Sequence, residues 1–141
     1  MDIKHLFDQY HAALDEFSRG NPLPVKKMFS HGDNVVLANP FGPPVRGWNK
    51  ASEALDFASS RFKDGKLMSY ETLATYETPD LLTIFEVEKW TAKVGGRDQL
   101  SSFDLCVTSI FQHEDDSWKL ILRHADPITS FHPDGPLRNA D

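Results

Sequence analysis

Two residues near the end of the chain carry the side chains best suited to proton transfer. His124 and Asp126 stand two positions apart in an apolar segment that Pro127 brings to an end. Alternation along an extended strand predicts that both face the same side. A carboxyl group against apolar walls has its pKa raised, which suits acid–base chemistry near neutral pH, and a neighbouring imidazole can share the proton. They form a candidate catalytic pair, and the alternative is ordinary structural hydrogen bonding at a strand end.

The preceding strand would supply an apolar wall for this pair. Asp115-Asp116 is typical of a short hairpin turn between the last two strands. Counting outward from a two-residue turn places His124 opposite Val107. The same register places Asp126 opposite Leu105. The apolar residues that we predict to contact a ligand on this surface are Val107, Phe111, Trp118 and Leu122.

Five residues from the first part of the chain are further candidates for ligand contact. Tyr10 belongs to a helical apolar stripe, so its ring suits the core, while its hydroxyl could reach a cavity. Asn39 and Phe41 lie in a proline-rich loop, where side chains beside a rigid scaffold often touch ligands. Asn39 could instead cap its own turn. Trp48 and Phe57 are expected in the core first, with ligand contact as a second role.

A second group of ionisable residues lies on the second long strand. Glu86, Glu88 and Trp90 share one face by alternation. The two carboxylates could perform acid–base chemistry or bind a cation. Glu is rarely buried unpaired, so a solvated or interface-facing surface is the favoured interpretation. Arg123 can pair with one of these acids across the strands.

Composition argues against several classes of function. The net charge of −6 opposes nucleic-acid binding, because phosphates are bound by an excess of Lys and Arg. No apolar stretch approaches membrane-spanning length. The histidines are scattered and no glycine-rich phosphate loop occurs, so we expect neither a metal nor a cofactor.

The expected compartment is the cytoplasm. Cys106 is the single cysteine, so no internal disulfide can form, and the first residues begin an amphipathic pattern rather than a signal peptide.

The order of elements predicts an α+β fold. Helical patterns cover residues 3–17, 25–29 and 49–62, and a short buried strand covers residues 35–38. Four long strands follow at roughly 68–76, 81–93, 100–112 and 118–126. Three helices packed on one face of a strongly curved antiparallel sheet would form a cone with a ligand cavity inside it.

Three stretches resemble bacterial members of the nuclear transport factor 2-like superfamily, of the SnoaL-like and ketosteroid-isomerase-like kind. They are the loop at 38–43 with Arg46-Gly47-Trp48, the segment 105–111, and the final strand 118–126, which is similar to an ending Trp-x-x-x-His-x-His-x-Asp or Ser. The resemblance implies a cystatin-like cone, with one SnoaL-like domain over residues 1–128 and a tail over 129–141. Two positions depart from the family pattern: Cys106 replaces an arginine, and Leu122 replaces the first histidine of the final strand.

The resemblance leaves two functional hypotheses open. The first is a small-molecule-binding protein acting as a cofactor-independent isomerase, cyclase or dehydratase on a small apolar carbonyl compound, with Asp126 as the acid–base residue. The second is a non-catalytic ligand-binding protein or a dimerisation or association module. In either case a homodimer is expected, because the second sheet face would expose Ile110, Ile121 and Trp90.

Overall fold

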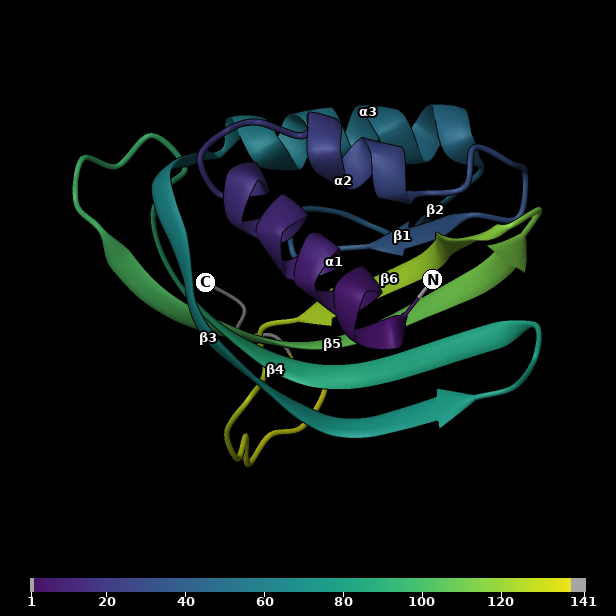
Figure 1. Ribbon diagram of the computed structural model, residues 1–141. Helices are drawn as coiled ribbons and strands as arrows, with labels where there is room; N and C mark the ends of the chain where they lie inside the picture. The colour runs from purple at the N-terminus through teal and green to yellow at the C-terminus, as the bar shows by residue number, and fades with distance from the viewer. Residues whose placement is uncertain (1, 138–141) are drawn as a thin grey trace.

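The computed structural model describes residues 2–137, in which three helices lie on one side of a curved sheet (Figure 1). The helices are α1 (Ile3–Phe17), α2 (Leu23–Met28) and α3 (Trp48–Ser60). The strands are β1 (Val36–Ala38), β2 (Val45–Arg46), β3 (Phe62–Glu77), β4 (Leu81–Val94), β5 (Ser101–Glu114) and β6 (Ser117–Asp126). The predicted α+β architecture is confirmed.

Helix α1 forms where the sequence pattern predicts it. The Asp2 carboxylate accepts a hydrogen bond from the backbone N–H of Lys4 at 3.2 Å and so caps the first turn. The apolar stripe turns toward the sheet, and Leu6, Tyr10 and Leu14 are buried there. Gly20, whose φ is +88°, lets the chain reverse after the helix. Tyr10 is thereby held against the concave face of the sheet.

The sheet is mixed and open, which differs from the predicted antiparallel cone. Its strand order is β2-β1-β6-β5-β4-β3, so β2 and β3 are edges. Strand β1 runs parallel to β6, with Val36 opposite Leu122, and antiparallel to β2, which the sequence pattern did not indicate. A two-residue strand in a proline-rich loop leaves no periodic signal.

Helix α3 ends earlier than predicted, and β3 begins almost at once. The helix stops at Ser60, and Phe62 is already paired with Val94 of β4. Gly65, predicted to end the helix, lies instead in β3 against the end of α1. A Cβ at this position would overlap the Ser18 carbonyl oxygen, so the close approach of the two backbones requires glycine.

A β-bulge in β6 reverses the side-chain directions predicted for the second half of that strand. Phe111 pairs with Leu120, but Ile110 pairs with Leu122, so Ile121 is an extra residue. Thr108 is therefore opposite His124, and the predicted register of His124 with Val107 is wrong. One extra residue moves every later side chain to the other face.

The register correction applies equally to Asp126, which is opposite Cys106 and not Leu105.

Beyond this strand, residues 127–137 contain no helix or strand. The predicted tail includes residues 138–141, which lie outside the described residues. None of the helices within residues 2–137 has the length and apolar character needed to cross a membrane.

Candidate functional site

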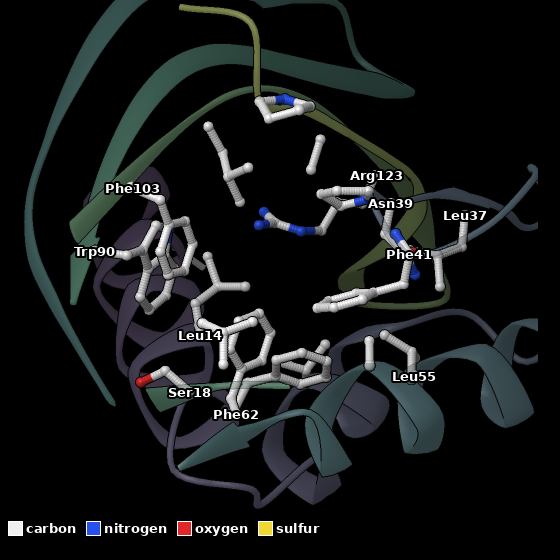
Figure 2. Close-up of a pocket in the computed structure, with 18 residues that line it drawn as sticks. Leu14, Ser18, Leu37, Asn39, Phe41, Leu55, Phe62, Trp90, Phe103 and Arg123 are labelled. Carbon is white, nitrogen blue, oxygen red and sulfur yellow. The ribbon is translucent and has the colours of Figure 1, made fainter. Parts of the chain in front are cut away.

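An apolar cavity of about 270 Å³ lies between the concave face of the sheet, the C-terminal half of α1, and α3 (Figure 2). This volume is close to the lower end of the roughly 300–1,000 Å³ range of ligand pockets, so it suits a small ring system. In the part of the chain that the structure describes, the polar residues that line it are Ser18, Asn39 and Arg123. Its apolar lining is Leu14, Phe17, Val25, Leu37, Pro40, Phe41, Leu55, Ala58, Phe62, Trp90, Val94, Phe103, Leu105, Ala125 and Pro127.

The bulge at Ile121 brings Arg123 to this cavity. After the bulge, Arg123 pairs with Ser109 and Ala125 pairs with Val107, so these β6 side chains share the concave face with the apolar side of β5. Figure 2 shows the Arg123 side chain extending toward the middle of the lining residues. Within residues 2–137, its guanidinium group is the only ionisable group that lines the cavity.

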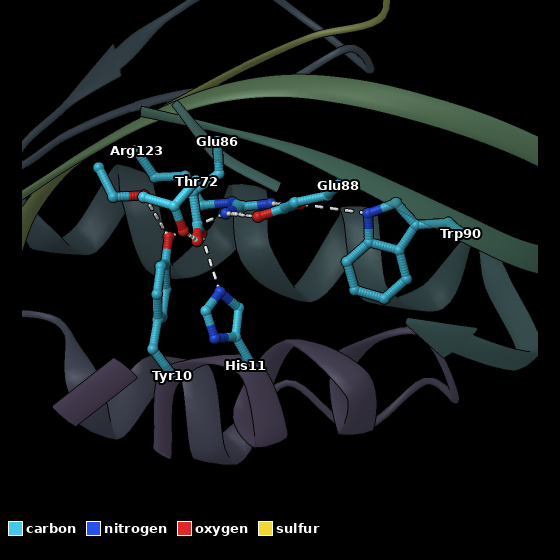
Figure 3. Close-up of polar contacts among 8 residues, drawn as sticks. Tyr10, His11, Thr72, Glu86, Glu88, Trp90 and Arg123 are labelled. Atoms are coloured by element: carbon cyan, nitrogen blue, oxygen red, sulfur yellow. Dashed lines mark hydrogen bonds and ion pairs between the residues drawn. The ribbon is translucent and has the colours of Figure 1, made fainter. Parts of the chain in front are cut away.

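Arg123 is fixed by a buried hydrogen-bonded network (Figure 3). Its Nη1 and Nη2 donate to Oε2 and Oε1 of Glu88 at 3.0 and 2.8 Å, which is a bidentate ion pair. Nη1 also donates to the Tyr10 hydroxyl at 2.8 Å, and this hydroxyl shares a second hydrogen bond with Ser109 Oγ at 2.6 Å. Trp90 Nε1 donates to Glu88 Oε1 at 3.1 Å. The network joins α1 to β4, β5 and β6.

A second polar cluster lies beside the first, farther from the cavity. Glu86 is 1% exposed, and its two oxygens accept from His11 Nε2 at 2.8 Å and from Thr72 Oγ1 at 2.7 Å. The His11 ring stacks on Tyr70, with centroids 3.6 Å apart. His11 Nδ1 is buried without a hydrogen-bond partner among residues 2–137. Both carboxylates of β4 are thus satisfied inside the protein.

Burial and neighbouring charge set the protonation states in the first network. Burial raises the pKa of the Tyr10 hydroxyl; Arg123 opposes this shift, and the Glu88 charge adds to it. Burial alone would lower the pKa of Arg123, but the Glu88 carboxylate and the Tyr10 oxygen raise it above its ordinary range. Arg123 is therefore a permanent cation and Tyr10 a neutral hydroxyl, so neither exchanges protons readily near neutral pH.

Of the predicted site residues, Asn39 and Phe41 line the cavity. Asn39 also closes its own turn, because its Oδ1 accepts from the Phe41 backbone N–H at 2.9 Å, so both proposed roles of this residue are present. Tyr10 is fully buried, and its hydroxyl reaches Arg123 rather than the cavity.

The other predicted ligand contacts lie elsewhere. Val107 and Phe111 are buried core residues of the concave face and do not line the cavity. Trp118 borders a shallow groove between α1, α2 and the start of β6. Leu122 lies on the convex face, beyond the bulge.

The two aromatic residues of α3 that we predict in the core, Trp48 and Phe57, differ in burial. Trp48 is half-buried and packs against the core, with its ring 3.9 Å from that of His31. Phe57 is 55% exposed, so its predicted place in the core is wrong. Its position on the helix faces outward, away from the buried side defined by Leu55 and Ala58.

His124 and Asp126 lie on the face of β6 opposite the cavity. His124 is exposed, and Asp126 is half-buried and accepts a hydrogen bond from the Ile128 backbone N–H at 2.7 Å. The side chain that the concave face receives from this part of β6 is Arg123. The catalytic assignment depended on the predicted register, and the pair has no access to the cavity through the strand.

The residues that sequence reasoning missed are Arg123 and the Glu86–Glu88–Trp90 face of β4. That face is buried, so its interpretation as a solvated or interface-facing surface is wrong, while the predicted pairing of Arg123 with one of its acids is confirmed. One signal was present: Lys89 and Lys93 alternate with these residues and mark the opposite face as the solvated one.

No three His, Cys, Asp or Glu side chains within residues 2–137 come together as metal ligands. The described part of the cavity lining consists of apolar walls and N–H or hydroxyl groups, which suits an organic molecule with a hydrogen-bond acceptor.

Comparison with known proteins identifies the architecture. No protein-family model and no curated protein matches the sequence. Among solved structures, a nuclear transport factor 2-like superfamily protein from Salmonella enterica is 14% identical with a TM-score of 0.75, over 93% of this chain and 92% of the other. A ketosteroid isomerase-like protein from Erwinia carotovora atroseptica is 16% identical with a TM-score of 0.73, over 91% and 95%.

A candidate calcium/calmodulin-dependent protein kinase II association domain from Xanthomonas campestris is 18% identical with a TM-score of 0.68, over 92% of this chain and 87% of the other. Identities this low establish the fold alone. This chain has the nuclear transport factor 2-like fold.

Proposed function

We propose that this protein binds a small, largely apolar molecule in the cavity between α1, α3 and the concave face of the sheet. The observation that carries the proposal is a cavity of about 270 Å³ with an apolar lining and one buried, rigidly held donor group, Arg123. Apolar walls with a few fixed polar groups are characteristic of ligand sites.

Binding without turnover is favoured over acid–base catalysis. The lining contains no Asp, Glu, His, Lys, Tyr or Cys among residues 2–137, and Arg123 stays protonated. Proton transfer needs a group that can gain and lose a proton within hydrogen-bond reach of the substrate. His124 and Asp126, the predicted acid–base pair, would have to reach a substrate from the convex side of β6.

The test is direct binding of an apolar probe that fits the cavity. We expect 2-isopropenylnaphthalene to raise the melting temperature in a concentration-dependent way, because a ligand that binds the folded state stabilises it. Ala125→Met narrows the cavity and should remove the shift. Ala12→Met is the matched control, because Ala12 borders the shallow groove beside α2. A shift that survives Ala125→Met and disappears in Ala12→Met would place the ligand in the groove and reject the proposal.

A second candidate function is association through the convex face of the sheet. Similarity to a candidate association domain favours it, as do the half-buried apolar side chains Phe85, Val87, Ile110 and Leu122 on that face. We propose a homodimer that covers this face. The sequence pattern places Trp90 on this surface, but Trp90 is a core residue at 5% exposure.

The homodimer is tested by sedimentation equilibrium at micromolar concentration. A dimer that Ile110→Glu converts to a folded monomer supports the convex face as the interface, because a charge buried in an apolar contact opposes association. A monomeric wild-type protein would contradict the proposal. The ligand proposal does not depend on this result.

A further inference from the structure

We infer that the cavity selects neutral carbonyl-bearing ligands over carboxylates of the same size and shape. The inference rests on the proposed binding function, and it concerns the charge of the ligand rather than whether one binds. Arginine beside an apolar pocket ordinarily suggests an anion site. The surroundings of Arg123 point to the opposite preference.

The charge of Arg123 is already neutralised by the Glu88 carboxylate, on the side of the guanidinium group away from the cavity. Both guanidinium Nη atoms bind the two oxygens of Glu88, at 3.0 and 2.8 Å. The Glu88 side chain is 0% exposed, whereas that of Arg123 is 10% exposed. Arg123 is therefore the member of the pair that faces the cavity, and Glu88 is the fixed counter-ion on its far side. A ligand anion would have to compete with a complete bidentate pair.

A second buried carboxylate lies nearby on the same face of β4. Glu86 has His11 as its only ionisable partner among residues 2–137, through Nε2 at 2.8 Å. If His11 is an imidazolium, its charge and that of Arg123 offset the two carboxylates and the cluster is neutral. If His11 is neutral, the cluster carries one negative charge. In neither state does the cluster present net positive charge to an incoming carboxylate.

Arg123 still has hydrogen-bonding capacity for an uncharged acceptor. Its bonds to Tyr10 and Glu88 use both Nη1 hydrogens and one Nη2 hydrogen. Nε–H and the second Nη2–H have no acceptor within residues 2–137. Asn39 adds a neutral donor from the cavity wall, because its oxygen accepts from Phe41 and its amide nitrogen has no acceptor among the described residues. A ketone, amide or ester oxygen fits these donors without bringing a charge.

The apolar lining of the cavity makes the transfer of a carboxylate from water into the cavity unfavourable in free energy. An ion moved from water into surroundings such as Phe41, Phe103 and Leu105 loses its hydration, and only a net opposite charge offsets that loss. A carbonyl group loses much less hydration and regains a hydrogen bond. The discrimination therefore follows from the charge balance of the cluster more than from the shape of the cavity.

Three probes of nearly equal size test the inference by calorimetry at pH 7: 2-acetylnaphthalene, 2-naphthoate and the hydrocarbon 2-isopropenylnaphthalene. We expect the ketone to bind at least about tenfold more tightly than the acid. Equal or tighter binding of the acid, with the hydrocarbon also bound, overturns the inference and leaves the proposed function intact. If none of the three binds, the proposed function fails, and the inference fails with it.

Removing the counter-ion should shift the preference toward the acid. Glu88→Gln takes one negative charge out of the cluster, so the acid should gain about tenfold to hundredfold relative to the ketone, as expected for one charge about 6–12 Å away at an effective dielectric constant of about 20. Glu53→Gln, the same substitution at an exposed position of α3, is the matched control and should leave the ratio unchanged.

Glu86→Gln provides a milder variant in which the Arg123–Glu88 pair remains complete. It removes one negative charge from the cluster and should shift the ratio toward the acid by less than Glu88→Gln does. Circular dichroism of each variant checks that it is folded. If Glu88→Gln does not fold, Glu86→Gln decides the question. An unchanged acid-to-ketone ratio in the folded variants would show that the buried charges do not set the preference.

Discussion

The concave face of the sheet is filled in two different ways along the same strands. Under the middle of α1, polar side chains from α1 and from β3 to β6 form hydrogen-bonded clusters, with Glu86 and Glu88 almost fully buried. Toward α3 and the loop that carries Phe41, the same face leaves an apolar cavity of about 270 Å³. Arg123 and Trp90 belong to both regions, which meet at these two side chains.

The difference between these two regions shows that one part of the concave face can contribute to stability and another part to ligand binding. Each member of the network depends on partners from other elements, so the loss of one member leaves a buried group unpaired. The cavity lining borders space that is already empty, so a shortened side chain there removes fewer contacts. We therefore expect substitutions in the network to change the free energy of unfolding and substitutions in the cavity to change ligand affinity. Four predictions follow this division, from the largest expected effect to the smallest.

Arg123→Leu should lower the free energy of unfolding by about 3–5 kcal/mol, since it leaves the Glu88 carboxylate buried without its cation. Urea denaturation followed by circular dichroism measures the loss. The double variant Arg123→Leu/Glu88→Leu should recover most of it, because no charge is then left unpaired. A double variant that is no more stable than the single one would show that the pair matters for packing rather than for charge.

Tyr10→Phe should cost about 1–3 kcal/mol, because Arg123 loses one acceptor and Ser109 loses its buried partner. The ring itself keeps its edge contact with Phe111, whose centroid is 5.2 Å away. Ligand affinity should stay within a factor of about three, because the hydroxyl does not face the cavity. A variant with wild-type stability and weakened binding would assign the hydroxyl to the ligand instead.

Phe41→Ala should show the opposite pattern. Phe41 is half-buried in the loop beside the cavity and packs edge-on against Phe62, with centroids 5.4 Å apart. We expect about 1 kcal/mol or less of lost stability and about a tenfold loss of affinity for 2-isopropenylnaphthalene, since the ring supplies part of the ligand's apolar contact. Unchanged affinity, measured by calorimetry, would move the ligand away from this loop.

The fold could be predicted from the sequence because its signals are local and repeated. The apolar stripe from Leu6 to Leu14 fixes α1 on the sheet, and strict alternation fixes the faces of β5, where Leu105, Val107 and Phe111 are inward. Strand β2 and the parallel pairing of β1 with β6 left no such signal, since both depend on contacts between segments far apart in the chain.

The site could not be predicted in the same way, because it depends on a single extra residue. The bulge lies in a run of three apolar residues, Leu120, Ile121 and Leu122. Because any of them could face either side of the sheet, the sequence gives no sign that one residue is extra. Regular alternation then assigns His124 to the cavity and Arg123 to the outside, the reverse of their positions. Glu88 was likewise expected at the surface, because its buried partner could not be placed without that register.

His124→Ala and Asp126→Asn should have the smallest effects, and they test the contrast between the two faces of β6. Both residues lie on the convex side, and the Asp126 oxygen that accepts from Ile128 is retained in the asparagine. Substitutions at such positions change stability by about 0.5 kcal/mol or less, so the urea midpoint should barely move. Affinity for 2-acetylnaphthalene should also be unchanged, because no atom of either side chain lines the cavity. An Ala74→Ser variant, on the same convex face but on the edge strand β3, controls for nonspecific effects. If His124→Ala or Asp126→Asn abolishes binding while the control does not, ligand contact occurs at the convex face, and the acid–base pair predicted from the sequence becomes the leading candidate for the site.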